Sequence, residues 1–358
     1  MSEKRKGIIL ASEFSSGHLA ASMKIALLSA GIIIFVVIVG IFIGYRDASN
    51  KSGNEMEIPP DPGNADISLK RIRQTAARNG VREWSLDAES AQYFKASDKA
   101  ILKNPSVVFF RKNRSDVRLS AKQGILHTSS NNIEAHGAVT VAAERYTLKT
   151  EKLAYSHKEK IIASMVPGKI LKDGSFLEAR KISINLKDDR TLFEGSVKCS
   201  LKEKNSGRKG SGAKKIYVTA DRLTVSHATG YAEFTWNVRM SGEKIYVSSN
   251  RVKIDYKKDS GKKKLTLAED AIDRITAFGD VNIKFDNRVA MSDKAMYIRK
   301  NRLLILTGKN ATLVSDEYKV FGTRIALDMD RGHIKIEGNN DRRVKAVVFP
   351  GAAKKTKH

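Results

Sequence analysis

The side chains that most often carry out chemistry are few in this chain and are not arranged as a catalytic set. Its seven histidines form no His-Glu-x-x-His motif, and no pair stands at metal-ligand spacing with a carboxylate partner. We interpret them as structural or solvated side chains: His18, His127, His136, His157, His227, His333 and His358. No Gly-x-Ser-x-Gly motif is present, and the glycine- and lysine-rich residues 207–214 lack the Gly-Lys-Ser/Thr ending of a phosphate loop. The sequence therefore predicts no enzyme activity, no metal and no cofactor.

The single cysteine and the charge exclude further classes of protein. Cys199 alone cannot form an intramolecular disulfide framework or a cysteine-based metal site, and its strand-like alternation with Val197 favours a small buried side chain over a reactive thiol. The formal charge is +26, because 65 Lys and Arg residues stand against 39 Asp and Glu. The basic residues are spread along the chain and aromatic residues make up only 7% of it, which favours a solvated sheet surface over a nucleic-acid footprint.

One segment near the N-terminus is long and apolar enough to cross a membrane. Residues 25–45 carry no charge and as a helix would span about 31 Å. Basic residues precede this segment: Lys4, Arg5, Lys6 and Lys24. They predict a cytoplasmic N-terminus over residues 1–24 and place the bulk of the chain across the membrane. A cleaved signal peptide is the alternative, disfavoured because the apolar run is long and ends at Arg46-Asp47. Residues 46–64, with three of the six prolines, are interpreted as an extended tether.

The rest of the chain repeats a short unit eight times. Each copy begins at a small residue: Ala88, Ala121, Thr150, Ala179, Ala220, Ser249, Ser292 and Gly322. The fifth position after it is always large and apolar: Tyr93, Leu126, Tyr155, Ile184, Val225, Ile254, Tyr297 and Leu327. Sixteen positions after it stands a glycine in four copies, and Gly279 is a fifth, displaced by an insertion; the four are Gly137, Gly195, Gly308 and Gly338. Period-two alternation with these turn residues predicts two strands per unit, stacked into two facing sheets, with the glycines at bends that need a positive φ.

A break in this array predicts the domain boundary. Residues 202–213 are rich in glycine, serine and lysine, and residues 202–212 hold no large apolar side chain. They separate two sets of four units, a domain over 65–201 and a second over 214–352, followed by a basic tail over 353–358. We expect one continuous sheet through both domains.

Residues in both predicted domains resemble those of a known family. The tether, residues 79–88 (NGVREWSLDA) and the first four units resemble LptC, the membrane-anchored periplasmic protein of lipopolysaccharide export. Residues 220–225, 275–283 and 343–350 resemble LptA, the OstA-type periplasmic bridge protein. The resemblance implies an all-β periplasmic part, made of two stacked twisted open β-jellyrolls after one transmembrane helix. It further implies a single-pass inner-membrane protein that accepts lipopolysaccharide from an ABC transporter and passes it through an apolar groove. The chain departs from the family by holding both proteins as one.

The shared positions in the repeats supply the candidate site residues. Twelve apolar residues after the small residues or turn glycines are predicted to line one interior groove: Leu153, Tyr155, Ile182, Ile184, Leu223, Val225, Val252, Ile254, Val281, Ile283, Ile325 and Leu327. The unpaired end strands are predicted to dock partners, a transporter at one end and a further bridge protein or outer-membrane receptor at the other; they carry Ile67, Leu69 and Ile72, and Val344, Val347 and Phe349. A structural envelope scaffold with a closed β-solenoid core is the alternative function.

Overall fold

The computed structural model describes residues 8–10, 65–78, 81–110, 116–143, 146–172, 174–185, 187–188, 190–202, 215–226, 228–257, 272–339 and 343–349. These residues form strands and one short 3-10 helix, so the predicted all-β class is confirmed for the described chain. The chain divides into two compact units. We call residues 31–201 and 222–229 the N-terminal unit, and residues 1–30, 202–221 and 230–358 the C-terminal unit. The predicted transmembrane segment, the tether and nearly all of the predicted linker lie outside the described residues.

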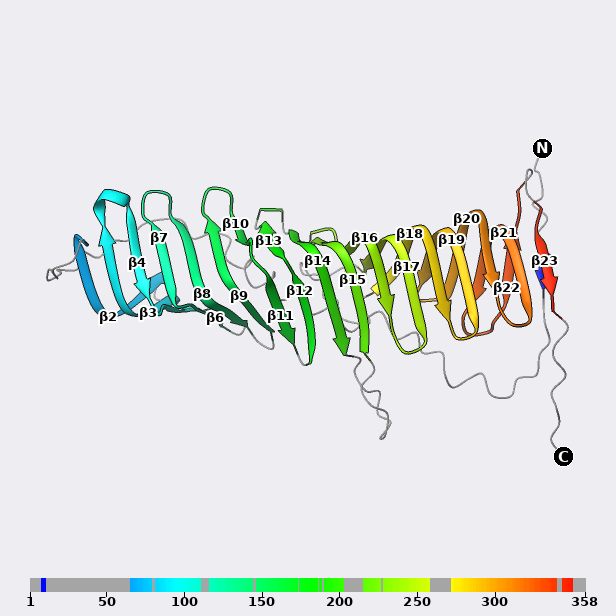
Figure 1. The fold of residues 1–358 in the computed structure, drawn as a ribbon, viewed down its shortest axis with the longest axis horizontal. Helices are drawn as coiled ribbons and strands as arrows, with labels where there is room; N and C mark the ends of the chain where they lie inside the picture. Colours follow the sequence, from blue (N-terminus) through cyan, green and yellow to red (C-terminus); the bar gives the residue numbers. More distant parts are fainter. Residues whose placement is uncertain are drawn as a thin grey trace, which may run out of the picture. The chain divides into compact units, whose positions relative to one another are not determined.

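The N-terminal unit is built from short strands and long bent ones. Its elements are β2 (Ile67–Arg78), β3 (Val81–Phe94), η1 (Lys95–Ser97), β4 (Lys99–Lys103), β5 (Ser106–Phe109), β6 (Val117–Ser120), β7 (Gln123–His127), β8 (Asn132–Ala143), β9 (Tyr146–Ser156), β10 (Ile161–Ser164), β11 (Gly168–Lys172), β12 (Ser175–Ala179), β13 (Lys181–Asn185) and β14 (Arg190–Lys202). Neighbouring strands lie side by side in Figure 1 and pair antiparallel.

The C-terminal unit continues the same pattern with longer strands. Its elements are β15 (Lys215–Ser226), β16 (Tyr231–Ser241), β17 (Ile245–Tyr256), β18 (Ile272–Phe285), β19 (Arg288–Ile298), β20 (Leu303–Val314), β21 (Tyr318–Asp328), β22 (Ile334–Glu337), β23 (Lys345–Val348) and β1 (Ile8–Leu10). The division into units falls within β15, after Asp221. Strands β16 to β21 pair in chain order, and β21 pairs with β22 along one half and with β23 along the other.

In both units the sheet has two parts, which we call leaves, and the leaves are joined at bends. Strand β3 pairs with β4 through residues 90–94 and with β5 through residues 84–87, so one long strand serves both leaves. In the long strands the bend is a β-bulge, where the register slips between Thr235 and Val238 in β16 and between Phe278 and Val281 in β18. These bends divide the long strands between two leaves, because a bulge changes the direction of the strand in which it occurs.

Left-handed backbone conformations at these bends confirm the expected role of most turn glycines. Gly137, Gly195 and Gly279 have φ values of 76°, 78° and 73°, and the residue after each is also left-handed. At Gly338, by contrast, the structure has no left-handed φ. Strand β16 makes its bulge without glycine, with φ values of 62° at Trp236 and 51° at Asn237. An Asn side chain tolerates this conformation, whereas a tryptophan there is strained. Repeat spacing alone did not predict this tryptophan bulge.

Position 279 requires glycine for two reasons, its left-handed φ and the close approach of the Asn250 side chain. A second left-handed glycine without such a neighbour provides a matched control. A Cβ at Gly279 would lie 2.6 Å from Nδ2 and 3.1 Å from Cβ of Asn250, whereas a Cβ at Gly332, with φ of 71°, would meet nothing within 4 Å. We expect Gly332→Ala to lower the free energy of unfolding by about 1–2 kcal/mol, the cost of a left-handed alanine. Gly279→Ala should cost roughly 1–3 kcal/mol more because the contact adds strain. Urea unfolding of both full-length variants measures the difference, and equal losses would contradict a close-packed bulge at Gly279.

One face of each leaf forms the apolar interior. In the C-terminal unit the strand pairings join one inner row: Ala232, Ile254, Ile275, Tyr297, Leu304, Leu327 and Ile334. In the N-terminal unit the corresponding row is Ile67, Tyr93, Ala100, Leu126, Ile133, Tyr155, Ile162 and Ile184. These two rows contain every large residue that stands fifth in a repeat unit except Val225. The regular spacing follows from this arrangement, because each unit contributes one such side chain to its row.

Candidate functional site

The structure places the predicted groove residues inside the two units. Eleven of the twelve are buried, with exposures of 8% or less, and Tyr155 is half-buried. The buried ones are Leu153, Ile182, Ile184, Leu223, Val225, Val252, Ile254, Val281, Ile283, Ile325 and Leu327. Each large side chain of this kind stabilises the fold by about 1.5–3 kcal/mol when it leaves water. Burial is equally required of a packed core and of a groove wall, so the groove assignment stays a prediction.

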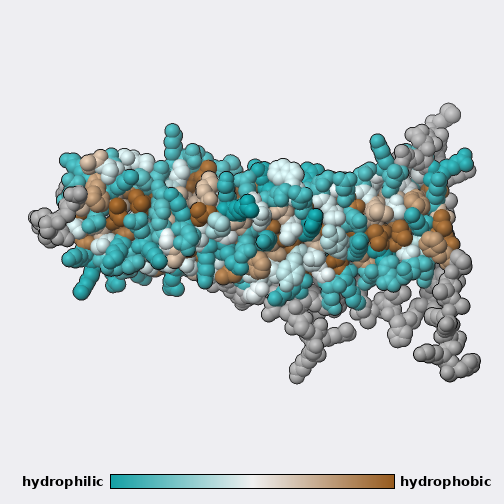
Figure 2. Space-filling view, in the orientation of Figure 1, coloured by the Kyte–Doolittle hydropathy of each residue, from teal (hydrophilic) through white to brown (hydrophobic). Residues whose placement is uncertain are grey.

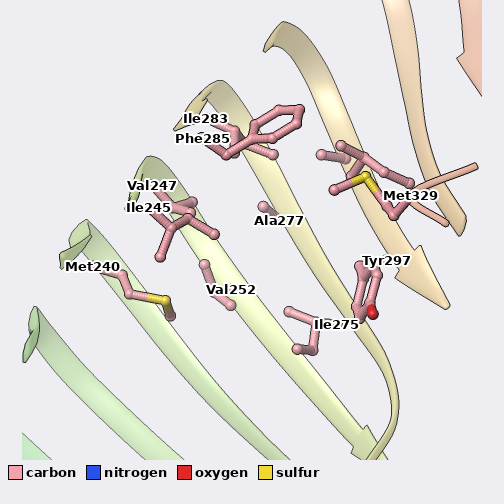
Figure 3. A pocket seen from close by; sticks show the side chains of 12 residues that line it. Met240, Ile245, Val247, Val252, Ile275, Ala277, Ile283, Phe285, Tyr297 and Met329 are labelled. Atoms are coloured by element: carbon pink, nitrogen blue, oxygen red, sulfur yellow. The ribbon is translucent and has the colours of Figure 1, made fainter. Parts of the chain in front are cut away.

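The C-terminal unit contains an apolar cavity of about 60 Å³. Twelve residues from β16 to β20 and the turn after β21 line it: Met240, Ile245, Val247, Val252, Ile275, Ala277, Ile283, Phe285, Ala295, Tyr297, Leu304 and Met329. Figure 3 shows their side chains converging on this space. A water molecule needs roughly 10–15 Å³ of such volume and two to four polar partners, so a cavity with this lining stays dry. It has room for a short stretch of hydrocarbon, and a longer chain requires the two leaves to part.

Of the predicted groove residues, only Val252 and Ile283 line this cavity. The other ten are not among the residues that line it. Two of the missed residues carried a visible signal, because Ala295 and Tyr297 stand third and fifth after Ser292, as apolar or small residues do in every unit. Ile245 and Val247 stand four and two positions before Ser249, on the same face by period-two alternation. The alternation before Ser249 would have found these two lining residues.

The interior of the N-terminal unit is accessible from outside along several strands. Ile133, on the inner row, is 48% exposed, and its row neighbours Leu126 and Tyr155 are only half-buried. Further along the same row Ile162 and Ile184 are buried. Figure 2 shows apolar surface over the β2 end of this unit, bordered by hydrophilic residues. Part of the inner row of the N-terminal unit is therefore in contact with solvent.

The two predicted docking segments lie on strands that each have a single partner among the described strands. Strand β2, which holds Ile67, Leu69 and Ile72, pairs with β3, and all three side chains are half-buried. Strand β23 pairs with β21. Around it Val344 is half-buried, whereas Val347 and Phe349 are 48% and 41% exposed. Both strands present an unpaired row of backbone groups of the kind that adds a further strand. Docking itself stays a prediction.

Charged residues on the outer faces contact opposite charges or aromatic rings. In the N-terminal unit Glu134 accepts from Lys152 Nζ at 2.8 Å and lies 3.2 Å and 3.0 Å from the Nε2 atoms of His127 and His136. The hydrogen bond from Lys152 is the main cause that lowers the pKa of Glu134 to about 2. In the C-terminal unit Arg251 and Lys294 lie over the Phe278 ring, at 4.2 and 5.4 Å from its centre. These contacts are typical of a solvated, salt-bridged sheet surface.

Among the described residues no group of three or more metal-ligating side chains is placed to hold an ion. Cys199 is buried, and burial raises the pKa of its thiol, which confirms the interpretation as a small core side chain. In the part of the chain that the structure describes, no helix has the length and hydropathy needed to span a bilayer.

Two family models match the chain in tandem. The first, described as lipopolysaccharide-assembly, LptC-related, matches residues 32–202. The second, described as LptA/(LptD N-terminal domain) LPS transport protein, matches residues 217–333. No curated protein matches the chain. Among solved structures the chain is similar to LptH, described as the LptA homologous periplasmic component of the lipopolysaccharide transport device from Pseudomonas aeruginosa. The two sequences are 15% identical, the match covers 38% of this chain and 95% of that chain, and the TM-score is 0.31.

Proposed function

Because this chain joins an LptC-related segment to an LptA-type segment in one periplasmic bridge protein of lipopolysaccharide transport, we propose that it takes lipopolysaccharide from an ABC transporter and passes it through its apolar interior toward the outer membrane. The observation that carries this proposal is the apolar inner row of each unit. In the N-terminal unit this row is exposed at Ile133, and in the C-terminal unit residues of the row line the cavity. A structural scaffold with a closed core is not favoured, since both matched models describe lipopolysaccharide assembly or transport.

The energetics of the substrate support an enclosed path. Exposing one acyl chain of 12–14 carbons to water costs about 10 kcal/mol, at about 0.8 kcal/mol per methylene. Several chains per molecule make free diffusion across the periplasm prohibitively slow. Facing apolar leaves offer the chains a continuous alternative to water, and the outer basic residues suit phosphate and acidic sugar groups that stay outside. We retain the proposals that both units continue as one sheet and that their end strands dock the transporter and a further bridge protein or outer-membrane receptor.

We also propose that residues 25–45 stay attached as an inner-membrane anchor. In the structure Ile8–Leu10 pair with β22, an arrangement that a membrane-spanning anchor would exclude. Three ladder pairs contribute on the order of 0.5–1.5 kcal/mol each. The anchor segment holds fourteen large aliphatic or phenylalanine side chains, and removing them from water yields roughly 1.5–3 kcal/mol each. These energies favour insertion of the segment in the membrane.

The anchor proposal predicts that the full-length chain fractionates with the inner membrane and keeps its own N-terminus. A chain that starts at residue 46 and is exported by a cleavable signal peptide should fractionate with soluble periplasmic proteins, because it lacks the apolar segment. Fractionation together with N-terminal sequencing measures both results. A mature wild-type protein that begins after Tyr45 would show that the segment is removed.

A further inference from the structure

The turn between β19 and β20, residues 299–302, lies between two residues that line the cavity in the C-terminal unit, Tyr297 and Leu304. The Arg299 N–H donates to the Asp273 carbonyl at 3.2 Å, and the Arg302 N–H donates to the Arg299 carbonyl at 3.2 Å. The Arg302 carbonyl in turn accepts from the N–H of Met329 at 3.0 Å. Met329 lines the cavity, as does Tyr297, two residues before the turn. Backbone hydrogen bonds therefore fix this turn directly against the cavity wall.

The turn brings a guanidinium group to this end without a matching carboxylate. Nη1 of Arg299 is buried and has no hydrogen-bond partner, and the ion pairs among the described residues do not include Arg299. Two neighbouring acids are engaged elsewhere: Asp330 pairs with Arg302, and Oδ1 of Asp328 accepts from the N–H groups of Asp330 and Arg331 at 2.9 Å each. Arg299 as a whole is half-buried, but a buried guanidinium N–H without an acceptor is costly and is the kind of donor that an anionic ligand satisfies.

Tyr297 stands two residues before Arg299 on the same strand end and lines the apolar space. It is the one residue with a hydroxyl group among the twelve that line the cavity, and Figure 3 shows its hydroxyl oxygen on the far side of the lining from Met240. Burial raises the pKa of the Tyr297 hydroxyl, and the nearby Arg302 and Arg299 oppose that rise. The hydroxyl therefore stays protonated at neutral pH and is available as a second donor beside the guanidinium groups.

We propose that Arg299, together with the Tyr297 hydroxyl, forms an oxyanion subsite for the headgroup of an amphiphile whose apolar chain enters the adjoining cavity. This inference rests on the proposed function and adds the headgroup chemistry that one end of the interior selects. Arginine suits the role because its planar guanidinium binds phosphate or carboxylate through two hydrogen bonds. The cavity supplies the apolar half of the same recognition, and the two halves meet at Tyr297.

Binding of three lipids to the purified full-length chain tests this subsite. The probes are diphosphoryl lipid A, fully dephosphorylated lipid A, and dephosphorylated lipid A that carries an acidic sugar, so that phosphate and carboxylate sources are separated. We expect the wild-type chain to bind at least one anionic form about tenfold more tightly than the neutral form, the effect of one charge-assisted hydrogen bond. Arg299→Gln should abolish this preference and leave binding of the neutral form unchanged, whereas Arg299→Lys should keep part of it.

Arg331→Gln is the matched control, because Arg331 lies in the next turn and is exposed. It should keep the wild-type preference. Equal binding of all three lipids by the wild-type chain would overturn the subsite and leave the proposed function standing. An Arg299→Gln variant that binds every form equally weakly would also overturn the subsite. If the wild-type chain binds none of the three lipids, the proposed function fails together with the subsite.

Discussion

Replacing Ile133 by aspartate should leave the chain folded and cut lipopolysaccharide transfer at least tenfold. The Ile133 side chain lies on the inner row between Leu126 and Tyr155, yet it is 48% exposed. A carboxylate there remains hydrated while the interior is empty, so the fold tolerates it. A passing acyl chain would strip that water from an unpaired charge, which costs several kcal/mol, and every 1.4 kcal/mol is a factor of about ten.

The matched control is Met165→Asp, because Met165 lies in the bend between β10 and β11 and is 68% exposed. Transfer is measured as lipopolysaccharide that reaches the outer membrane in cells depleted of the wild-type chain. The deeper positions Ile184 and Ile254 are unsuitable for this test, since they are 3% and 0% exposed and a charge there would unfold the protein before it could block lipid. If both variants transfer lipid at the wild-type rate, the inner row of the N-terminal unit is not on the path.

Replacing Val348 by proline should weaken capture of the partner at the C-terminal edge. The N–H of Phe349 donates to the Glu317 carbonyl at 2.8 Å, so by antiparallel alternation the N–H of Val347 also faces β21. The N–H of Val348 then faces away from β21 and is free to pair with an added strand. Proline removes that donor, and on an edge strand it is tolerated by the fold. Loss of one ladder bond and steric blockage of its neighbours should weaken capture by a factor of about ten or more.

Val348→Ala is the control for this experiment, because it shortens the 67% exposed side chain and keeps the N–H. Capture is measured by co-purification of a tagged chain with a second copy of itself, one form of the further bridge protein proposed for this edge. Val347 stood out from the sequence as the edge residue, but its proline variant would break the internal pairing with Lys319. Equal capture by Val348→Pro, Val348→Ala and the wild-type chain would exclude strand addition at β23.

Much of the architecture could be predicted from the sequence because strands have a fixed period of two residues. The structure buries Val225, Ile254 and Leu327, which are large apolar residues five positions after the small residue that opens each unit. The turn glycines were equally informative, since Gly137, Gly195 and Gly279 stand where a left-handed backbone bends the long strands. Such positions admit few residue types, so their spacing carries structural information.

The cavity could not be derived in the same way. Alternation tells which face a side chain takes, but the space left between facing side chains depends on their sizes and on the twist of both leaves. Val281 and Ile283 were predicted alike, yet only Ile283 lines the cavity. Arg299 was also invisible as a candidate, because its buried nitrogen near Tyr297 arises from a turn that backbone hydrogen bonds hold in place. The bulge at Trp236 has no glycine and was not predicted either, because the surrounding structure can hold a residue in a strained backbone conformation that its intrinsic preference disfavours.

Photocrosslinking in living cells tests most directly whether lipid travels through the interior. A benzophenone amino acid would replace Tyr155 on the inner row of the N-terminal unit, Phe285 in the cavity wall, and Lys284, the exposed neighbour of Phe285 that faces outward. If lipid follows the apolar inner rows, we expect lipopolysaccharide adducts at positions 155 and 285 and none at 284. Adducts at 284 as abundant as those at 285, or no adducts at 155 and 285 while lipid still reaches the outer membrane, would contradict transport through the interior.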